Sequence, residues 1–284
     1  MWSCTGRVDS GESRMAPFLK IAGSLVALYL AVVGLATMFQ GKLLFPRGMV
    51  GPGAPLPPKA ERLTLGMGSG DELVGVHLPA DRPLPEGASL VLGFGGNAWN
   101  ADDLALHLHS VFPDRDVVAF HYRGYPPSTG RPSARAILKD ALDIHDEIIA
   151  ELNPDRIVAV GLSLGAGPAA HLAWSRPITG LVLVTPFDTL TALAREHYSW
   201  LPVGLLLRHR MDVAADLRAV TQPVAVIAAE ADSIVPPRRT APVRKAADNL
   251  VLDRVIAGAG HNDIYDRAQY RRAMQDALSL IESK

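Results

Sequence analysis

The feature that most constrains the fold of this chain is the stretch of residues 157–175. It opens with a continuous apolar run, passes through Gly-Leu-Ser-Leu-Gly at residues 161–165, and continues into a segment rich in alanine. A short run that is apolar on both faces is typical of a strand buried inside a parallel sheet. Glycines on both sides of Ser163 favour a sharp turn. The stretch therefore predicts a buried strand, a tight turn and a helix in immediate succession.

Strand-like and helix-like segments alternate along the rest of the chain. Strands are expected at residues 62–67, 72–78, 89–94, 116–122, 156–161, 180–186, 224–229 and 250–256. Helices are expected at residues 101–111, 133–151, 164–174, 189–198, 237–247 and 263–282. The first two strands alternate polar and apolar residues and suit an antiparallel edge pair, whereas later strands are apolar on both faces. This order predicts an α/β fold with a mostly parallel, doubly wound sheet.

Composition excludes several classes of protein. The 284 residues suffice for one large α/β domain, and the formal net charge of −1 offers no basic surface to a nucleic acid. Cys4 is the only cysteine, so no internal disulfide can form. No Gly-x-Gly-x-x-Gly follows the first strand, and His107 and His109 face different sides of a predicted helix. We therefore expect no cofactor and no metal.

An uncharged apolar segment at residues 21–39 precedes the main domain. At about 1.5 Å per residue it spans roughly 28 Å, close to the ~30 Å core of a bilayer. A membrane anchor is the favoured interpretation, because the apolar run continues past the small residues at 34–36 as far as Phe39. The alternative is a signal peptide that is cleaved near residues 34–36.

The sequence predicts four parts. Residues 1–20 form a polar leader, 21–39 the transmembrane anchor or signal peptide, 40–60 a linker rich in proline and glycine, and 61–284 the main domain. Within the main domain, residues 188–222 are expected to form a short lid. Its apolar side chains either cover the sheet or form a lip that receives an acyl chain or touches a membrane surface.

The charges that flank the apolar segment predict its orientation. Three basic residues precede the segment and two follow soon after it. The positive-inside rule then predicts a single-pass membrane protein with its main domain on the external or periplasmic side. If translation starts at Met15, most of this bias disappears.

Ser163 is the candidate nucleophile, because Gly-x-Ser-x-Gly between a buried strand and a helix is a nucleophile elbow. Residues larger than Gly161 and Gly165 would clash in so sharp a turn. The hydroxyl then projects from the sheet at the start of a helix, where the backbone dipole favours developing negative charge. The alternative interpretation is a glycine-flanked turn without a chemical role.

A nucleophilic serine needs a base and a group that orients the base. Asp232 and His261 each follow a late strand, in the chain order that this type of site uses. His261 has the alternative of capping the next helix. Asp188 and Glu230 are rival acids, and Asp188 has the further alternative of capping the helix after it.

An oxyanion hole needs two backbone N–H groups. The sequence predicts that of Leu164, directly after the nucleophile, and that of Asn97 in the loop after the strand at 89–94. Gly95 and Gly96 let this loop approach a substrate closely.

Five stretches carry a resemblance to a known family: LGFGGNAWN, HYRGYPPSTGRPS, GLSLGA, EADSIVPP and GAGHND. Over residues 55–284 the chain resembles the α/β-hydrolase superfamily, and within it a group of membrane-anchored serine hydrolases. That group includes lysophospholipid lipases and thioesterases that remove palmitate from proteins. The resemblance implies an α/β-hydrolase fold, the triad Ser163, Asp232 and His261, and a small-molecule or lipid-like acyl substrate.

The chain departs from the family pattern at two places. Gly95 stands where relatives usually carry a histidine that braces the oxyanion loop, and Pro126 stands where a glycine is common. We expect residues 122–125 to be structural, with a carboxylate partner for Arg123. An ester or thioester hydrolase fits best. An aminopeptidase-like amide hydrolase or a non-catalytic binding protein would share the same fold.

Overall fold

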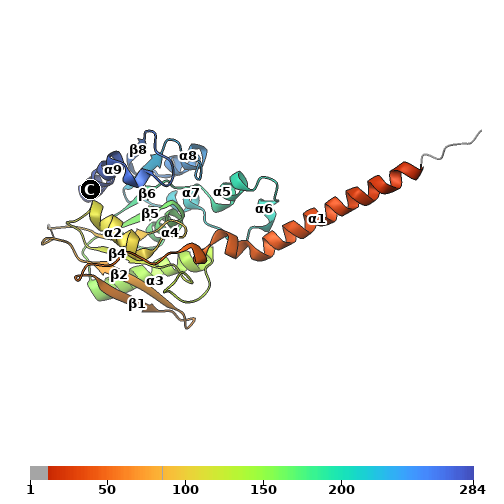
Figure 1. The fold of residues 1–284 in the computed structure, drawn as a ribbon. Coiled ribbons are helices and arrows are strands. Elements are labelled where there is room, and N and C mark those ends of the chain that lie inside the picture. The colour runs from red at the N-terminus through yellow and green to blue at the C-terminus, as the bar shows by residue number, and fades with distance from the viewer. Residues whose placement is uncertain (1–11, 85) are drawn as a thin grey trace, which may run out of the picture. The chain divides into compact units, whose positions relative to one another are not determined.

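The computed structural model describes residues 12–84 and 86–284, and this part of the chain divides between Leu43 and Leu44 into two compact units (Figure 1). Cys4 and most of the predicted polar leader lie outside the described residues. Each unit is described by itself below.

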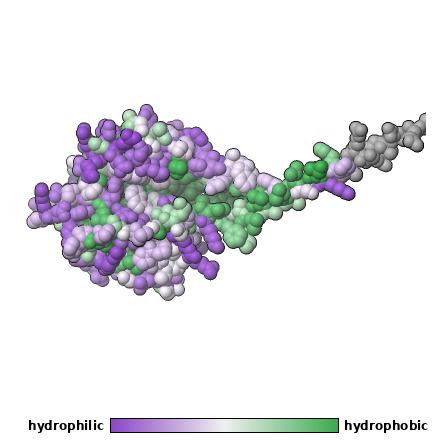
Figure 2. All heavy atoms as spheres, viewed as in Figure 1, coloured by the Kyte–Doolittle hydropathy of each residue, from purple (hydrophilic) through white to green (hydrophobic). Residues whose placement is uncertain are grey.

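The first unit is dominated by helix α1 (Glu12–Leu44), which is longer than the predicted 21–39. Its segment Pro17–Leu44 has a mean hydropathy of 2.1 and is long and apolar enough to cross a membrane. Apolar side chains cover its surface (Figure 2). The helix ends at Leu44 because Phe45 precedes Pro46, and helical conformation is disfavoured for the residue before a proline.

The larger unit begins at Leu44 and not at residue 61, where the sequence placed the start of the main domain. Phe45 is only 1% exposed. Further along, the Asn100 side-chain amide donates a hydrogen bond to the Gly51 carbonyl (2.9 Å). The Ala54 N–H donates to the Asp103 carboxylate (2.7 Å). Residues 45–60, the lead-in segment, therefore pack on the domain. They do not form a separate linker.

One sheet organises this unit, and its described strands lie in the order β1-β2-β4-β3-β5-β6-β7-β8. Strands β1 and β2 pair antiparallel, as predicted, and β2 also pairs antiparallel with β4, whereas the others are parallel. The strands are β1 (Glu61–Gly66), β2 (Glu72–Leu78), β3 (Leu90–Phe94), β4 (Val117–Phe120), β5 (Ile157–Leu162), β6 (Gly180–Val184), β7 (Val224–Ala229) and β8 (Leu250–Ile256).

Helices cover both faces of the sheet, which confirms the predicted doubly wound α/β fold (Figure 1). The buried side chains of α3, α4, α7 and α8 form one apolar cluster with the sheet, and those of α2 and α9 form another. The α-helices are α2 (Ala101–Val111), α3 (Ala134–Leu152), α4 (Ala166–Ser175), α5 (Leu190–His197), α6 (Val203–Leu206), α7 (Val213–Leu217), α8 (Pro237–Ala246) and α9 (Ala268–Glu282). Short 3₁₀ turns are η1 (Arg47–Met49), η2 (Ser163–Gly165) and η3 (Ile264–Asp266).

Local sequence sets where several helices begin. The side chains of Asn100, Ser133, Thr189 and Asp212 each accept a hydrogen bond from a backbone N–H in the first turn of the helix that follows. Such capping satisfies donors that a helix start leaves free. Helices α6 and α7 are too short to show a periodic pattern, so the sequence did not predict them; both lie within the predicted lid.

Candidate active site

Ser163 lies at the end of β5, in the turn that leads into α4, with a backbone φ of +51°. Such a left-handed conformation is rare for a residue with a side chain. A Cβ atom at Gly161 would lie 2.6 Å from the Gly165 carbonyl oxygen, and one at Gly165 would lie 2.0 Å from the Phe94 carbonyl oxygen. Only glycine fits at either position, so the turn has the geometry that the sequence predicted.

The structure brings Ser163, His261 and Asp232 into one hydrogen-bonded row. The Ser163 Oγ lies 2.9 Å from His261 Nε2, and His261 Nδ1 lies 2.7 Å from Asp232 Oδ2. Because a carboxylate only accepts hydrogen bonds, Nδ1 carries the proton and Nε2 is free to accept the serine proton. The side chains of His261 and Asp232 are 9% and 2% exposed. The arrangement can deprotonate Ser163 as its oxygen attacks a carbon atom.

Two loops hold the acid and the histidine in register. The second carboxylate oxygen of Asp232 accepts the N–H groups of Ile234 (2.9 Å) and Val235 (2.7 Å). The Ala231 N–H donates to the Ala259 carbonyl (2.8 Å), which ties the loop after β7 to the loop after β8. The imidazole therefore faces a carboxylate with both oxygens already oriented.

The rival acids bind other partners. Asp188 accepts the Thr189 N–H (2.8 Å) and lies 3.1 Å from the Arg239 guanidinium, and Thr189, not Asp188, caps α5. Glu230 accepts the Gly258 N–H (2.8 Å). Helix α9 has no side-chain cap, so the alternative of a capping role for His261 has no support. Among these carboxylates, the contacts of the described residues pair Asp232 with the histidine.

The loop after β3, residues 95–100, approaches the nucleophile from the neighbouring strand. A Cβ atom at Gly96 would lie 3.6 Å from the Ser163 Cβ, so the backbone next to Asn97 runs beside the nucleophile. Leu164 follows Ser163 in the first turn of η2 and is 6% exposed. The two predicted oxyanion residues therefore belong to segments that meet at Ser163.

A tyrosine that the sequence did not assign to the site supports this loop. The hydroxyl of the buried Tyr122, just after β4, donates to the Gly95 carbonyl (2.7 Å). A Cβ atom at Gly95 would lie 3.3 Å from the Trp99 Cβ. Trp99 thus packs against Gly95, and Tyr122 holds the same residue from the segment after β4. In the sequence, Tyr122 was the last residue of the strand predicted at 116–122.

Arg123 finds the carboxylate partner that the sequence required. Its guanidinium binds Asp140 of α3 through two contacts, 2.5 and 3.1 Å, and Asp71 through a third, 2.7 Å. These hydrogen bonds raise the pKa of Arg123 above its usual value. The pairs fix the segment that carries Tyr122 to the helix layer and to the β1–β2 turn.

The two histidines of α2 have different partners. His107 Nε2 lies 3.0 Å from the Tyr270 hydroxyl, and burial lowers the pKa of His107 to about 4. His109 Nε2 lies 3.1 Å from the Asp81 carboxylate. In the described part of the chain, no three His, Cys, Asp or Glu side chains are grouped to hold a metal ion.

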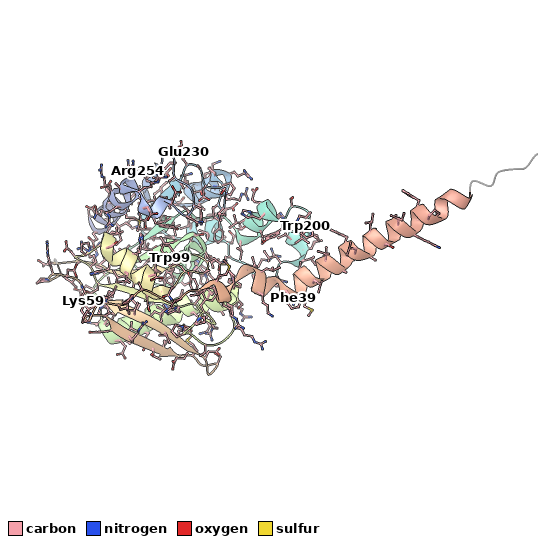
Figure 3. All side chains as sticks on the ribbon, in the orientation of Figure 1. Phe39, Lys59, Trp99, Trp200, Glu230 and Arg254 are labelled. Atoms are coloured by element: carbon pink, nitrogen blue, oxygen red, sulfur yellow. The ribbon has the colours of Figure 1, made fainter. Side chains whose placement is uncertain are left out.

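The segment expected as a lid combines buried and exposed apolar residues. Val203 and Leu207 pack with Ala194 in a small apolar cluster. Leu205 is 86% exposed and Trp200 is 54% exposed (Figure 3). The segment thus has apolar side chains that pack in the domain and others that are exposed to solvent.

Comparison with known proteins identifies the fold. A family model described as the alpha/beta hydrolase fold matches residues 90–204. An uncharacterized protein of Mycobacterium tuberculosis is 36% identical over 178 residues, which cover 61% of this chain and 63% of that protein. The chain therefore spans less than two thirds of that relative's length. The lysophosphatidylserine lipase ABHD12 of Danio rerio is 29% identical over 52% of this chain and 44% of its own.

Solved structures extend the likeness over more of the chain. The esterase Pf2001 of Pyrococcus furiosus covers 80% of this chain and 96% of its own, with a TM-score of 0.63 and 16% sequence identity. The alpha/beta hydrolase domain-containing protein 10 from mouse covers 78% of this chain with a TM-score of 0.58 and 18% identity. At such identities the likeness is one of fold.

Proposed function

The chain belongs to the α/β-hydrolase superfamily, and from that premise we propose that it is a membrane-tethered serine hydrolase of carboxylic esters or thioesters. The observation that carries the proposal is the row of short contacts from Ser163 through His261 to Asp232, 2.9 and 2.7 Å long. A hydroxyl that is hydrogen-bonded to a buried, oriented imidazole is an activated nucleophile.

The reaction follows from the groups in place. Ser163 Oγ attacks the acyl carbon while its proton passes to His261 Nε2, and Asp232 stabilises the imidazolium that forms. Nε2 then gives this proton to the leaving alcohol or thiol, and the acyl group stays on Ser163. Water, deprotonated by the same nitrogen, attacks the acyl-enzyme, and release of the acid restores the serine hydroxyl.

Two backbone N–H groups stabilise the tetrahedral intermediate in this proposal, those of Leu164 and Asn97. Support comes from Gly96, whose backbone runs beside Ser163, and from the position of Leu164 at the start of a helix. Backbone donors that are fixed before the substrate arrives act without reorganisation during the reaction.

The proposed substrate is an acyl ester or thioester with a lipid-like chain. The similarity to a lysophosphatidylserine lipase supports this class. So does the exposed Leu205 of α6, which offers an apolar surface to a chain or a bilayer. Leu205→Ser should lower the rate on a long-chain lysophospholipid in vesicles severalfold and leave the rate on p-nitrophenyl butyrate unchanged. An equal loss on both substrates would remove the lid from the proposal.

The test of the serine hydrolase is active-site labelling. A fluorophosphonate probe should label the full-length protein in detergent, and Ser163→Ala should abolish the label, because the probe reacts with an activated serine. Ser110→Ala is the matched control, since Ser110 lies exposed on α2 and should leave labelling unchanged. A wild-type protein that takes no label would favour a non-catalytic binding protein.

The membrane part of the proposal rests on the apolar segment Pro17–Leu44. As an uncleaved anchor it should keep the protein in the membrane fraction after a carbonate wash, which releases proteins held by surface charge. The flanking basic residues favour a main domain on the external or periplasmic side. A protein recovered in the soluble fraction with an N-terminus near Thr37 would replace the anchor with a cleaved signal peptide.

A further inference from the structure

The side chain of Asn97 is bound on both sides, although only its backbone N–H has a role in the proposed mechanism. Its Oδ1 accepts a hydrogen bond from the Tyr125 hydroxyl (2.7 Å). Its Nδ2 donates to the carbonyl of Leu44 (2.8 Å), the last residue of α1. Because the amide has one acceptor end and one donor end, these bonds fix which way it points.

Both partners of Asn97 are held firmly. Tyr125 is fully buried, and burial raises its pKa well above the usual value, so its hydroxyl stays protonated and donates. The Leu44 carbonyl is one of those that a helix end leaves without a partner in the helix. Phe45, the next residue, is 1% exposed and stacks edge-on against His209, with ring centroids 5.1 Å apart.

Resting on the proposed function, we infer that Asn97 is a positioning residue: its side chain, held between Tyr125 and the Leu44 carbonyl, sets the position of its own backbone N–H in the oxyanion hole. Gly95 and Gly96 before it impose little conformational restriction, so the loop needs a fixed point beyond them. Tyr122 holds the loop at Gly95, and the Asn97 side chain holds it next to the donor. Leu44, the first residue of the larger unit, thus belongs to the support of the site.

The test uses the full-length protein in detergent with p-nitrophenyl butyrate as substrate. Asn97→Ala keeps the backbone N–H and removes both side-chain bonds. We expect kcat to fall on the order of 10-fold or more with little change in KM, because the N–H acts on the transition state. Tyr125→Phe removes one of the two side-chain bonds of Asn97, together with the hydrogen bond between the Tyr125 hydroxyl and the Ala98 backbone, and should lower kcat by a smaller factor, roughly 3-fold.

The double variant tells whether Tyr125 affects kcat through its contact with Asn97 or independently of Asn97. If Tyr125 acts through Asn97, combining Tyr125→Phe with Asn97→Ala should cost no more than Asn97→Ala alone. The excess of Asn97→Ala over Tyr125→Phe then measures the bond to Leu44. Multiplication of the two losses would mean that Tyr125 acts elsewhere and would overturn its part in the inference.

Asn100→Ser is the matched control. Asn100 also donates from its side chain to the lead-in segment, at the Gly51 carbonyl (2.9 Å), but lies three residues further along the loop. Serine retains an N-cap for α2, so this variant should keep wild-type kcat. Equal losses in Asn100→Ser and Asn97→Ala would mean that general attachment of the loop matters, and would overturn a specific role for Asn97.

A second readout reports the oxyanion hole directly. A butylboronic acid forms a tetrahedral adduct with an active serine, and one of its oxygens occupies the oxyanion position. Its affinity should fall in Asn97→Ala by about the same factor as kcat/KM. Unchanged kcat and boronate affinity in Asn97→Ala would overturn the inference alone. A wild-type protein without fluorophosphonate labelling would overturn the proposed function as well. If Asn97→Ala does not fold, Tyr125→Phe carries the same tests.

Discussion

The two halves of the candidate site are held in different ways. The row Ser163, His261 and Asp232 is carried by loops at the ends of the parallel strands β5, β7 and β8, and each loop is shaped mainly by its own residues. The oxyanion loop has glycines where it meets the nucleophile, and it is held by Tyr122, Tyr125 and Leu44. Local sequence therefore builds the first half, and distant segments build the second.

The largest expected effect tests the first half. Ser163→Ala should lower kcat for a short p-nitrophenyl ester on the order of 10⁴-fold or more, while the protein stays folded, because the nucleophile is lost. The check is a steady-state assay beside a thermal melt. A variant that keeps most of its activity would remove Ser163 from the mechanism.

The next effect separates the acid from its rival. Asp232→Asn should lower kcat on the order of 10³-fold, because an amide at this position no longer favours the imidazole tautomer that the reaction needs. Asp188→Asn serves as the control. It weakens the contact of the buried Asp188 carboxylate with Arg239 but should leave kcat within about 3-fold of wild type, since the carboxylate that binds His261 is that of Asp232. The reverse ranking would move the acid to Asp188.

A pair of shortened chains tests the second half. A chain that starts at Leu44 keeps Phe45 and the carbonyl that binds Asn97, and it should fold and hydrolyse small esters. A chain that starts at Arg62 loses the buried Phe45, which alone costs about 3–5 kcal/mol of unfolding free energy. Its melting temperature should fall by many degrees, and kcat at a temperature where it is folded should fall about 10-fold. Equal behaviour of the two chains would make the lead-in segment dispensable.

The smallest effect concerns Tyr122. Tyr122→Phe removes the hydrogen bond to the Gly95 carbonyl and should lower kcat roughly 3–10-fold with an unchanged KM, as one neutral hydrogen bond contributes about 1 kcal/mol. Tyr29→Phe, in the apolar helix, is a matched control for the chemical change. A fall in melting temperature without a change in kcat would give Tyr122 a structural role only.

Sequence could predict the first half of the site because each of its signals is local. A buried apolar run, a glycine-flanked serine and an acid or histidine just after a strand are all visible within a few residues. The same is true of the strands β2, β7 and β8, whose bounds match the predicted ones. Parallel order then brings these strand ends together without further information.

The parts that sequence did not predict depend on contacts between distant residues. Arg123 binds Asp140, which lies on a helix, and no local sequence pattern around either residue predicts this ion pair. The start of the domain was placed at residue 61 because proline and glycine usually mark a linker. In the structure this segment is not a linker, because Phe45 and Gly51 contact residues far along the chain.

The missing side chain of Gly165 has a consequence for how the whole site responds to the reaction. Its backbone packs so closely on the end of β3 that a single added carbon would lie 2.0 Å from the Phe94 carbonyl oxygen. The turn that carries the nucleophile thereby packs directly on the backbone at the start of the oxyanion loop. Because no side chain lies between the two backbones, no change of rotamer can separate them. In the proposed reaction, charge moves from the serine to the acyl oxygen between backbone dipoles that this packing has already oriented. The energy needed to rearrange them would then be small, so the close packing of Gly165 on β3 would lower the barrier without touching the substrate.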